Sequence, residues 1–488
     1  MDKKILGSML NFAKRMKNLR VGKNSEAYSS TAKGRPVDIR SAEEIREIIE
    51  NGNFDQMLDL SRKFLSTSGL YKQIISFYSN LLSFDTYTSV RKSRKNKANR
   101  KKYIDHYSSA CYFADTVLNP QLNYPRVIMK ALTEGAYYGV LLVENEESAI
   151  LRDLPAEFCR SRKKNYSNVD IVELDMSYFN SLTNDEAEIR EILKEFPREF
   201  ATGYNAYLTN RQENQWFEIP EEYGTCFYFY DEEVPPLLSM IIAITNLNEY
   251  RNIEKDIDKQ ALEKILIQKI PLDGEGNFLL DTTESGDLHE GVVEMLRDLG
   301  YVDVLTTFAD VKVESLGDRT KGEKDNLEKV ERSVYNEAGV PQQLFSPDSV
   351  QGLASSIVNA MTFSLTLVKK IDNWATFHIN RLFAEKNKYI FKVDTLPITH
   401  YNRGEMIQFY LNGSTFGYSK MISFVARGEK QSFVMDTLEF ENDILRIHEN
   451  MIPTSSSHTT AGGASTETKE PDIKDQKESK ENEEVEDE

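Results

Sequence analysis

The chain has 488 residues, and its 60 basic and 78 acidic side chains give it a formal charge of −18 at pH 7. Hydrophobic residues make up 40% of the sequence, which excludes a chain disordered throughout and allows more than one packed core. The three cysteines, Cys111, Cys159 and Cys226, lie far apart, so they indicate neither a disulfide framework nor a cysteine-based zinc site.

The two ends of the chain carry opposite charges. Residues 1–35 contain nine bases and two acids, whereas residues 454–488 contain eleven acids and four lysines. The basic start has only short apolar stretches broken by lysine and arginine, which is not the pattern of a signal peptide. The best apolar run, 234–247, is shorter than the roughly 20 residues of a membrane span. We therefore expect a protein made in the reducing cytoplasm, with no membrane partner and with solvated ends.

Helical periodicity and one dense basic cluster mark the first part of the chain. Apolar spacing predicts helices within 41–52, 71–84, 103–117 and 124–139. Residues 91–102 hold eight bases and no acid, and we expect this cluster in a loop or helix extension between two helices. The eight bases are Arg91, Lys92, Arg94, Lys95, Lys97, Arg100, Lys101 and Lys102.

The next region is expected to be mixed α/β. Residues 140–145 and 148–155 read as a strand pair joined by a polar turn. Residues 168–179 and 225–233 are strand-like, and the charged stretch 185–196 between them has helical spacing.

Three long helices dominate the second half of the sequence. Residues 237–262 contain no glycine or proline, and their apolar spacing thins into a charged half, so this helix is expected to leave the protein body or to line something. A small β/α module at 264–316 separates it from a second helix at 320–338. After the loop 345–352, a third helix at 353–385 is apolar on nearly every side and should be buried.

The end of the chain returns to short elements. A strand is expected at 389–394, followed by three short helical stretches between 403 and 450. A polar tail of low complexity begins near residue 453.

Motifs for catalysis are lacking. The GxxxxGK[ST], HExxH and GxSxG patterns are absent, the six histidines are scattered, and no carboxylate pair stands out. We therefore expect no enzyme activity, no metal and no cofactor. The basic cluster at 91–102 allows two interpretations: contact with a phosphate backbone or an acidic partner, or a solvated loop. A weaker cluster at 160–164 favours solvated surface.

The order of the parts carries a resemblance. A long helix, a β/α insert, a second long helix ending in EAGVPQQLF, a loop and an apolar helix beginning LASSIVNAMTFSLTLVKKIDNW follow one another. Upstream, ALTEGAYYGVLLVENEESAILRDLPAEFCR combines a helix, a strand pair and an LP…FCR end, with Phe158 where the pattern has tyrosine. Over residues 41–453 this order resembles the portal proteins of tailed bacteriophages.

The resemblance implies an α+β, mainly helical portal-type subunit with a defined order of parts. These would be a basic arm (1–40), an α/β wing (41–233), a first stem helix (234–263), a β/α clip (264–318), a second stem helix (319–340), a tunnel loop (341–355), a spine helix with a return strand of the wing (356–402), a helical crown (403–452) and an acidic disordered tail (453–488). The tunnel-loop candidates are Ser346, Asp348, Ser349, Val350, Gln351 and Gly352, and the clip-interface candidates are Leu288, Val292, Leu296 and Leu299.

The resemblance also implies a function. Portal proteins form a ring, usually of twelve subunits, at one capsid vertex of the virion, through which double-stranded DNA is packaged and ejected. Their partners would be the large terminase subunit, the major capsid and scaffolding proteins, and a head-tail connector or adaptor. Two other hypotheses stay open: a cytoplasmic nucleic-acid-processing enzyme that uses the basic cluster, and another structural protein of a virion or scaffold.

Overall fold

The structure is a computed structural model that describes most of the chain between residues 42 and 447. The described ranges are 42–231, 233–262, 264–269, 302–307, 321–340 and 353–447, with the single residues 287 and 290. Within them, side chains are described except at 256–269, 302–307, 321–328 and 353–356. The fold of the described residues is α+β and mainly helical, which confirms the coarse class expected from the sequence.

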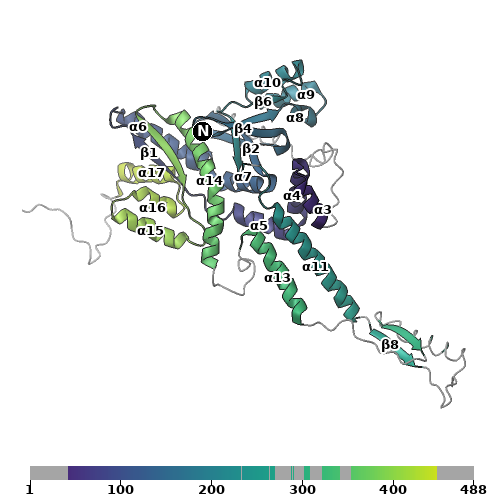
Figure 1. The fold of residues 1–488 in the computed structure, drawn as a ribbon. Helices are drawn as coiled ribbons and strands as arrows, with labels where there is room; N and C mark the ends of the chain where they lie inside the picture. Colours follow the sequence, from purple (N-terminus) through teal and green to yellow (C-terminus); the bar gives the residue numbers. More distant parts are fainter. Residues whose placement is uncertain are drawn as a thin grey trace, which may run out of the picture. The chain divides into compact units, whose positions relative to one another are not determined.

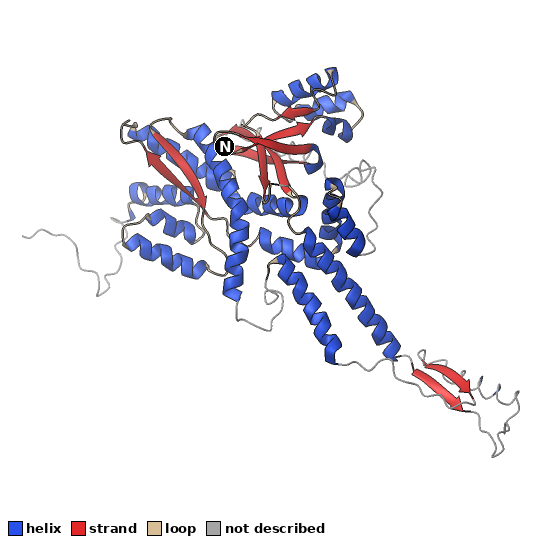
Figure 2. Ribbon diagram, in the orientation of Figure 1, coloured by secondary structure: helices blue, strands red, loops and turns tan. Residues whose placement is uncertain are grey.

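Helices and strands alternate along the chain (Figures 1 and 2). The α-helices are α3 (Ala42–Glu50), α4 (Phe54–Thr67), α5 (Gly69–Ser79), α6 (Arg100–Tyr112), α7 (Pro120–Glu134), α8 (Ser177–Leu182), α9 (Glu186–Leu193), α10 (Arg198–Thr209), α11 (Leu238–Leu262), α13 (Lys321–Ala338), α14 (Leu353–Phe383), α15 (Arg403–Thr415), α16 (Lys420–Ala426) and α17 (Gln431–Glu439). The strands are β1 (Thr86–Lys92), β2 (Ala136–Asn145), β3 (Ser148–Leu154), β4 (Cys159–Lys164), β5 (Asp170–Asp175), β6 (Trp216–Glu218), β7 (Gly224–Tyr228), β8 (Lys264–Lys269), β9 (Val302–Thr307) and β10 (Tyr389–Thr395).

The strands of the described residues form small sheets. β1 pairs with β10, and two three-stranded sheets have the orders β3-β2-β7 and β4-β5-β6, all antiparallel. β8 and β9 form a parallel pair. β1 and β10 are joined although about 300 residues separate Thr88 from its partner Val393 in the sequence, so the first and last parts of the fold share a sheet.

Helix α14 lies in the main hydrophobic core. Its residues Val368, Ile371 and Trp374 are buried, and the helix packs against α5, α6, α7 and β10. The expected burial of this helix is confirmed for one face only, because Val358 and Leu382 are 52% and 42% exposed. A second core lies around β5 and the helices α8 to α10, with Phe179 and Phe200 fully buried. Burying an aromatic side chain of this size contributes roughly 1.5–3 kcal/mol.

Helices α11 and α13 lie side by side and run in opposite directions (Figure 1). The start of α11 is buried at Met240, Ile241 and Leu247, and the end of α13 is buried at Val334 and Ala338. Beyond residue 248 the described side chains of α11 are exposed or half-buried. Both long helices are confirmed, as is the expected change from a buried to a solvated half.

The C-terminal helices α15 to α17 attach to β1 and its neighbours through buried polar groups. The side-chain amide of Gln431 accepts a hydrogen bond from the Thr88 backbone N–H (2.8 Å) and donates one to the Thr88 carbonyl (3.2 Å), on the edge of β1 that faces away from β10. Asp115 accepts hydrogen bonds from the backbone N–H and the hydroxyl of Ser432, both at 2.8 Å. Asp85, almost fully buried, forms an ion pair with Arg403 at 2.7 Å. Residues 436–447 belong to a separate unit, which contains the end of α17 and the π-helical segment Phe440–Ile444.

Several expectations for local structure were wrong. The basic cluster does not lie between two helices, because the alternating sequence before it forms β1 and pairs with β10. The strand expected over 168–179 ends at Asp175, whose carboxylate accepts a hydrogen bond from the Ser177 N–H and begins α8. The sequence reading also missed α4, β4, β6, α10 and β9.

Candidate functional site

The eight bases at 91–102 lie on one exposed strand–turn–helix segment, whose surface is called the basic surface below. Arg91 and Lys92 end β1, Arg94, Lys95 and Lys97 lie in the following turn, and Arg100, Lys101 and Lys102 form the first turn of α6. All eight side chains are exposed. The structure therefore brings together, on one strand–turn–helix segment, all the residues proposed from the sequence for contact with DNA or a partner.

The turn of the basic surface is fixed to a loop that is distant in the sequence. The Ser93 N–H donates to the Lys388 carbonyl (2.7 Å), and the Asn96 side-chain amide donates to the Asn387 carbonyl (3.0 Å). This loop also carries an exposed base, Lys386. Lys386 was not predicted as part of the site, because only the β1–β10 pairing reveals that this loop adjoins the cluster.

The start of α6 has a capping residue, but the charged side chains of its first turn have the unfavourable sign. The Asn99 side chain accepts a hydrogen bond from the Lys101 N–H (3.1 Å), which satisfies one of the free donors at the helix start. The first turn of a helix carries a positive partial charge, so bases in it are unfavourable by roughly 0.3–1 kcal/mol each. The sequence places three bases there, which local stability does not explain.

Aromatic packing holds the segment beneath the basic surface. The Tyr389 hydroxyl forms a hydrogen bond with Nδ1 of His106 (2.6 Å), and the Tyr389 ring contacts that of Tyr103 edge to face at 5.2 Å. The Lys92 ammonium lies 4.9 Å from the centre of the Tyr103 ring. The base of the surface is therefore a packed structure and not a free loop.

The basic surface lacks counter-charges in the described part of the chain. None of its eight side chains forms an ion pair with a described residue. Two described acids lie near the basic surface: Asp105, one turn after Lys101 on α6, and Glu385, whose pKa is lowered first by a hydrogen bond from Lys388 and to a lesser extent by the charge of Lys102. Neither forms an ion pair with any of the eight bases.

The second basic cluster, at 160–164, is largely paired. The Arg160 Nε donates to Glu173 at 2.6 Å, and its guanidinium lies 3.7 Å from the centre of the Trp216 ring. Lys163 pairs with Glu218 at 3.0 Å. This agrees with its interpretation as ordinary protein surface.

The facing sides of α11 and α13 are held together by charge as well as by apolar contact. Arg251 on α11 forms an ion pair with Glu331 on α13 at 2.7 Å. Tyr78 on α5 donates a hydrogen bond to the Ala338 carbonyl at the end of α13 (2.6 Å). Two large apolar side chains of α11, Tyr250 and Ile253, are 47% and 55% exposed. The helix pair thus has packed contacts at its base and uncovered apolar groups further along.

Two groups of sequence candidates lie outside the described residues. They are the tunnel-loop residues Ser346, Asp348, Ser349, Val350, Gln351 and Gly352, and the clip-interface residues Leu288, Val292, Leu296 and Leu299.

The described residues do not form a catalytic constellation. Burial raises the pKa of the Cys111, Cys159 and Cys226 thiols, which disfavours the reactive thiolate. Burial also lowers the pKa of His378 to about 4, so it is neutral at physiological pH. No group of three metal-binding side chains is found in the part of the chain described here.

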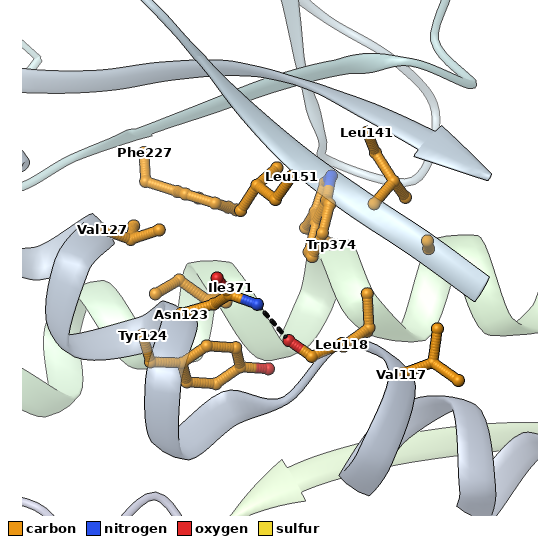
Figure 3. A pocket seen from close by; sticks show the side chains of 11 residues that line it. Val117, Leu118, Asn123, Tyr124, Val127, Leu141, Leu151, Phe227, Ile371 and Trp374 are labelled. Carbon is orange, nitrogen blue, oxygen red and sulfur yellow. Dashed lines mark hydrogen bonds between the residues drawn. The ribbon is translucent and has the colours of Figure 1, made fainter. Parts of the chain in front are cut away.

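A small cavity lies between α7, β2, β3, β7 and α14 (Figure 3). Its lining is mostly apolar, with Val127, Leu141 and Phe227 among its walls. The Asn123 amide donates to the Leu118 carbonyl at 2.7 Å, as Figure 3 shows, and so is already satisfied. The lining also includes Tyr124 and Trp374, whose hydroxyl and indole N–H are buried without a hydrogen-bond partner among the described residues, so the cavity is small and mostly apolar but not wholly so.

No described helix combines the length and apolarity needed to cross a bilayer. No protein-family model matches the sequence, and no curated protein matches it.

Proposed function

We propose that this chain is a subunit of a ring-forming portal protein that conducts double-stranded DNA. The observation that carries the proposal is the pair of long helices α11 and α13. Both helices are joined to the main core at one end. In the sequence they flank a segment that contains the β8–β9 pair, and they precede the long helix α14, which lies in the main core. This order of elements is the one on which the sequence resemblance rests.

Exposed apolar side chains support assembly with further copies of the chain. Tyr250 and Ile253 on α11 are about half exposed, and Phe409, Phe416 and Tyr418 around α15 are 65%, 85% and 73% exposed. Helix α15 has no buried residue at all. Burial of such side chains by a neighbouring subunit is stabilising, and a repeated contact between unlike faces forms a ring when its rotation closes.

The charge of the chain supports passage of DNA rather than tight retention. A channel lined uniformly by bases would hold DNA through counterion release at every phosphate. The net charge of −18, with bases concentrated in limited places, suits a conduit better. In this proposal the ring occupies one capsid vertex and docks the packaging terminase and the head-tail connector.

The size and shape of the purified particle test the proposal. We expect sedimentation to give a particle many times the mass of the 56.1 kDa chain, and negative-stain images to show rings with a central opening. A protein that stays monomeric or dimeric at every concentration and salt condition would exclude the ring.

A pair of matched variants sharpens this test. The double variant Tyr250→Ser and Ile253→Ser should fold normally and lose ring assembly, because it removes exposed apolar groups from α11. The control, Leu122→Ser and Tyr166→Ser, removes two apolar groups that are even more exposed from other parts of the chain and should still form rings. Loss of rings in both variants, or in neither, would contradict the role given to α11.

A further inference from the structure

We propose that the basic surface binds the phosphate backbone of duplex DNA without reading its sequence. The geometry that supports this is a single strand–turn–helix segment that presents eight exposed cations, none of which has an ion-pair partner among the described residues. The inference goes beyond the proposed ring, because it concerns a surface that every single subunit carries.

The basic surface is electrostatically unfavourable for the isolated chain. Eight like charges within twelve residues repel one another, and Arg100, Lys101 and Lys102 also oppose the dipole of α6. The cluster at 160–164 shows how this chain treats bases that serve its own fold, since Arg160 and Lys163 have carboxylate partners there. The basic surface has none among the described residues, so an anion from outside the chain would relieve its repulsion.

The backbone of the basic surface is ordered before an anion binds. The turn is fixed by the hydrogen bonds of Ser93 and Asn96 to the loop at 387–388, and α6 begins at a capped residue, Asn99. Because the backbone is already ordered, only the side chains lose freedom when an anion binds.

The amino-acid composition of the basic surface indicates the class of its partner. Protein interfaces are depleted in lysine and rely on buried aromatic or apolar anchors. Five of the eight bases are lysines, and the other residues of the segment are Ser93, Asn96, Ala98 and Asn99. Lysine and arginine beside serine, asparagine and a helix N-terminus are the groups that contact DNA phosphates. The composition therefore favours a phosphate backbone over an acidic protein.

The lack of exposed aromatic rings on the basic surface favours duplex over single-stranded nucleic acid as its ligand. Proteins that bind single strands stack bases on exposed aromatic rings. Residues 91–102 contain no aromatic residue, and the Tyr103 ring beside them is half-buried and contacts Lys92 and Tyr389. A surface that offers charge without stacking suits the regular phosphate rows of a duplex.

The experiment measures binding of the full-length protein to a labelled 30-base-pair duplex of arbitrary sequence over a range of salt concentrations. The test variant is the triple substitution Arg94→Gln, Lys95→Gln and Lys97→Gln, which changes only exposed side chains of the turn. Each lost phosphate contact reduces the slope of log affinity against log salt by about 0.9. We expect the slope to fall by about 1–3 and the affinity at 0.1 M salt to fall by at least about tenfold.

The control removes the same charge elsewhere. Arg190→Gln, Lys194→Gln and Arg198→Gln neutralise three exposed bases on and beside α9 and α10, and DNA affinity should change little. An equal loss in both triple variants would overturn the proposal, since only total charge would matter. Tighter binding to a single strand of the same length would overturn the assignment to duplex DNA, and equal binding to poly-glutamate would point to an acidic protein instead.

The ring and the basic surface can fail separately. The sedimentation profile of each triple variant is recorded on the sample used for binding. Rings that no longer bind the duplex would support the inference, whereas subunits that bind it without forming rings would refute only the ring.

Discussion

The two basic clusters of the chain differ in what surrounds them. At 160–164 the bases sit on a sheet whose neighbouring strands supply Glu173, Glu218 and Trp216 as partners. At 91–102 the bases lie at the end of a sheet and the start of a helix; no described carboxylate forms an ion pair with them, although Lys92 lies over the Tyr103 ring. The density of basic residues in the sequence does not by itself distinguish the two clusters. The two clusters differ in whether the fold places a carboxylate beside each base. A cluster without such carboxylates is available for a ligand.

The same contrast between partnered and unpartnered charge occurs in the interior. Asp85 and Asp372 are both buried, but Asp85 has Arg403 as an ionic partner, whereas among the described residues the carboxylate of Asp372 accepts hydrogen bonds from the backbone and hydroxyl of Thr395 and forms no ion pair. Four predictions use this contrast, in order of decreasing effect.

The largest effect is expected from the unpartnered Asp372. Burial is the main cause that raises its pKa to about 7, well above the value of about 3.9 in an unfolded chain. Between these values the folded protein keeps a proton that the unfolded chain has lost, so the free energy of unfolding falls by about 1.4 kcal/mol per pH unit as pH rises from about 4 to 7. Asp372→Asn should remove this slope, a difference of about 4 kcal/mol over the range. Urea denaturation at several pH values measures it, and parallel pH profiles for the two proteins would contradict it.

The next effect is expected from breaking the partnered interior charge. Arg403→Met leaves the Asp85 carboxylate buried without its cation and should lower the free energy of unfolding by about 3 kcal/mol at pH 7. The loss should be smaller at pH 4, because burial already raises the pKa of Asp85 and the carboxyl can take up a proton. The control Glu405→Gln removes an exposed acid from the first turn of the same helix and should cost no more than about 0.3–1 kcal/mol. Adding Asp85→Asn to Arg403→Met should recover part of the loss; no recovery would show that the ion pair was not the cause.

The paired surface cluster should give an intermediate effect. Arg160→Ala removes an ion pair with a mostly buried Glu173 and the stacking on Trp216, and should cost about 2 kcal/mol of unfolding free energy. Arg94→Ala, in the unpaired basic surface, should change it by less than about 0.5 kcal/mol. Thermal or urea unfolding distinguishes them, and equal losses would remove the difference drawn between the two clusters.

The smallest effect has the opposite sign. Lys101→Glu replaces a base in the first turn of α6 with an acid and should stabilise the protein by about 0.3–1 kcal/mol, while weakening duplex binding. Lys95→Glu makes the same charge change in the turn, outside the helix, and should weaken binding without stabilising. If both variants unfold at the same urea concentration, the helix start does not oppose its bases as argued.

Prediction from the sequence was good for long periodic elements and poor for elements defined by distant partners. Helices α11 and α14 were located because their apolar spacing is local information. β1 was missed because its strand character depends on β10, about 300 residues later. The eight bases of the basic surface were named from the sequence and are all exposed, yet nothing in the sequence near Arg160 indicates Glu173 or Trp216 as its partners. Local composition finds candidate sites, and only the fold shows which of them are already satisfied.

The side chain of Gln431 has a consequence for crowded copies of the chain. A two-stranded sheet normally offers a free edge to which strands of other molecules can add, and this is a common route to aggregation. At Thr88, in the middle of β1, the Gln431 amide occupies both the N–H and the carbonyl of that edge, and the fixed start of α17 holds it there. A strand from another copy could not pair with β1 without first displacing a helix. The outer edge of β1 is therefore protected at its middle against strand addition when copies of the chain are crowded.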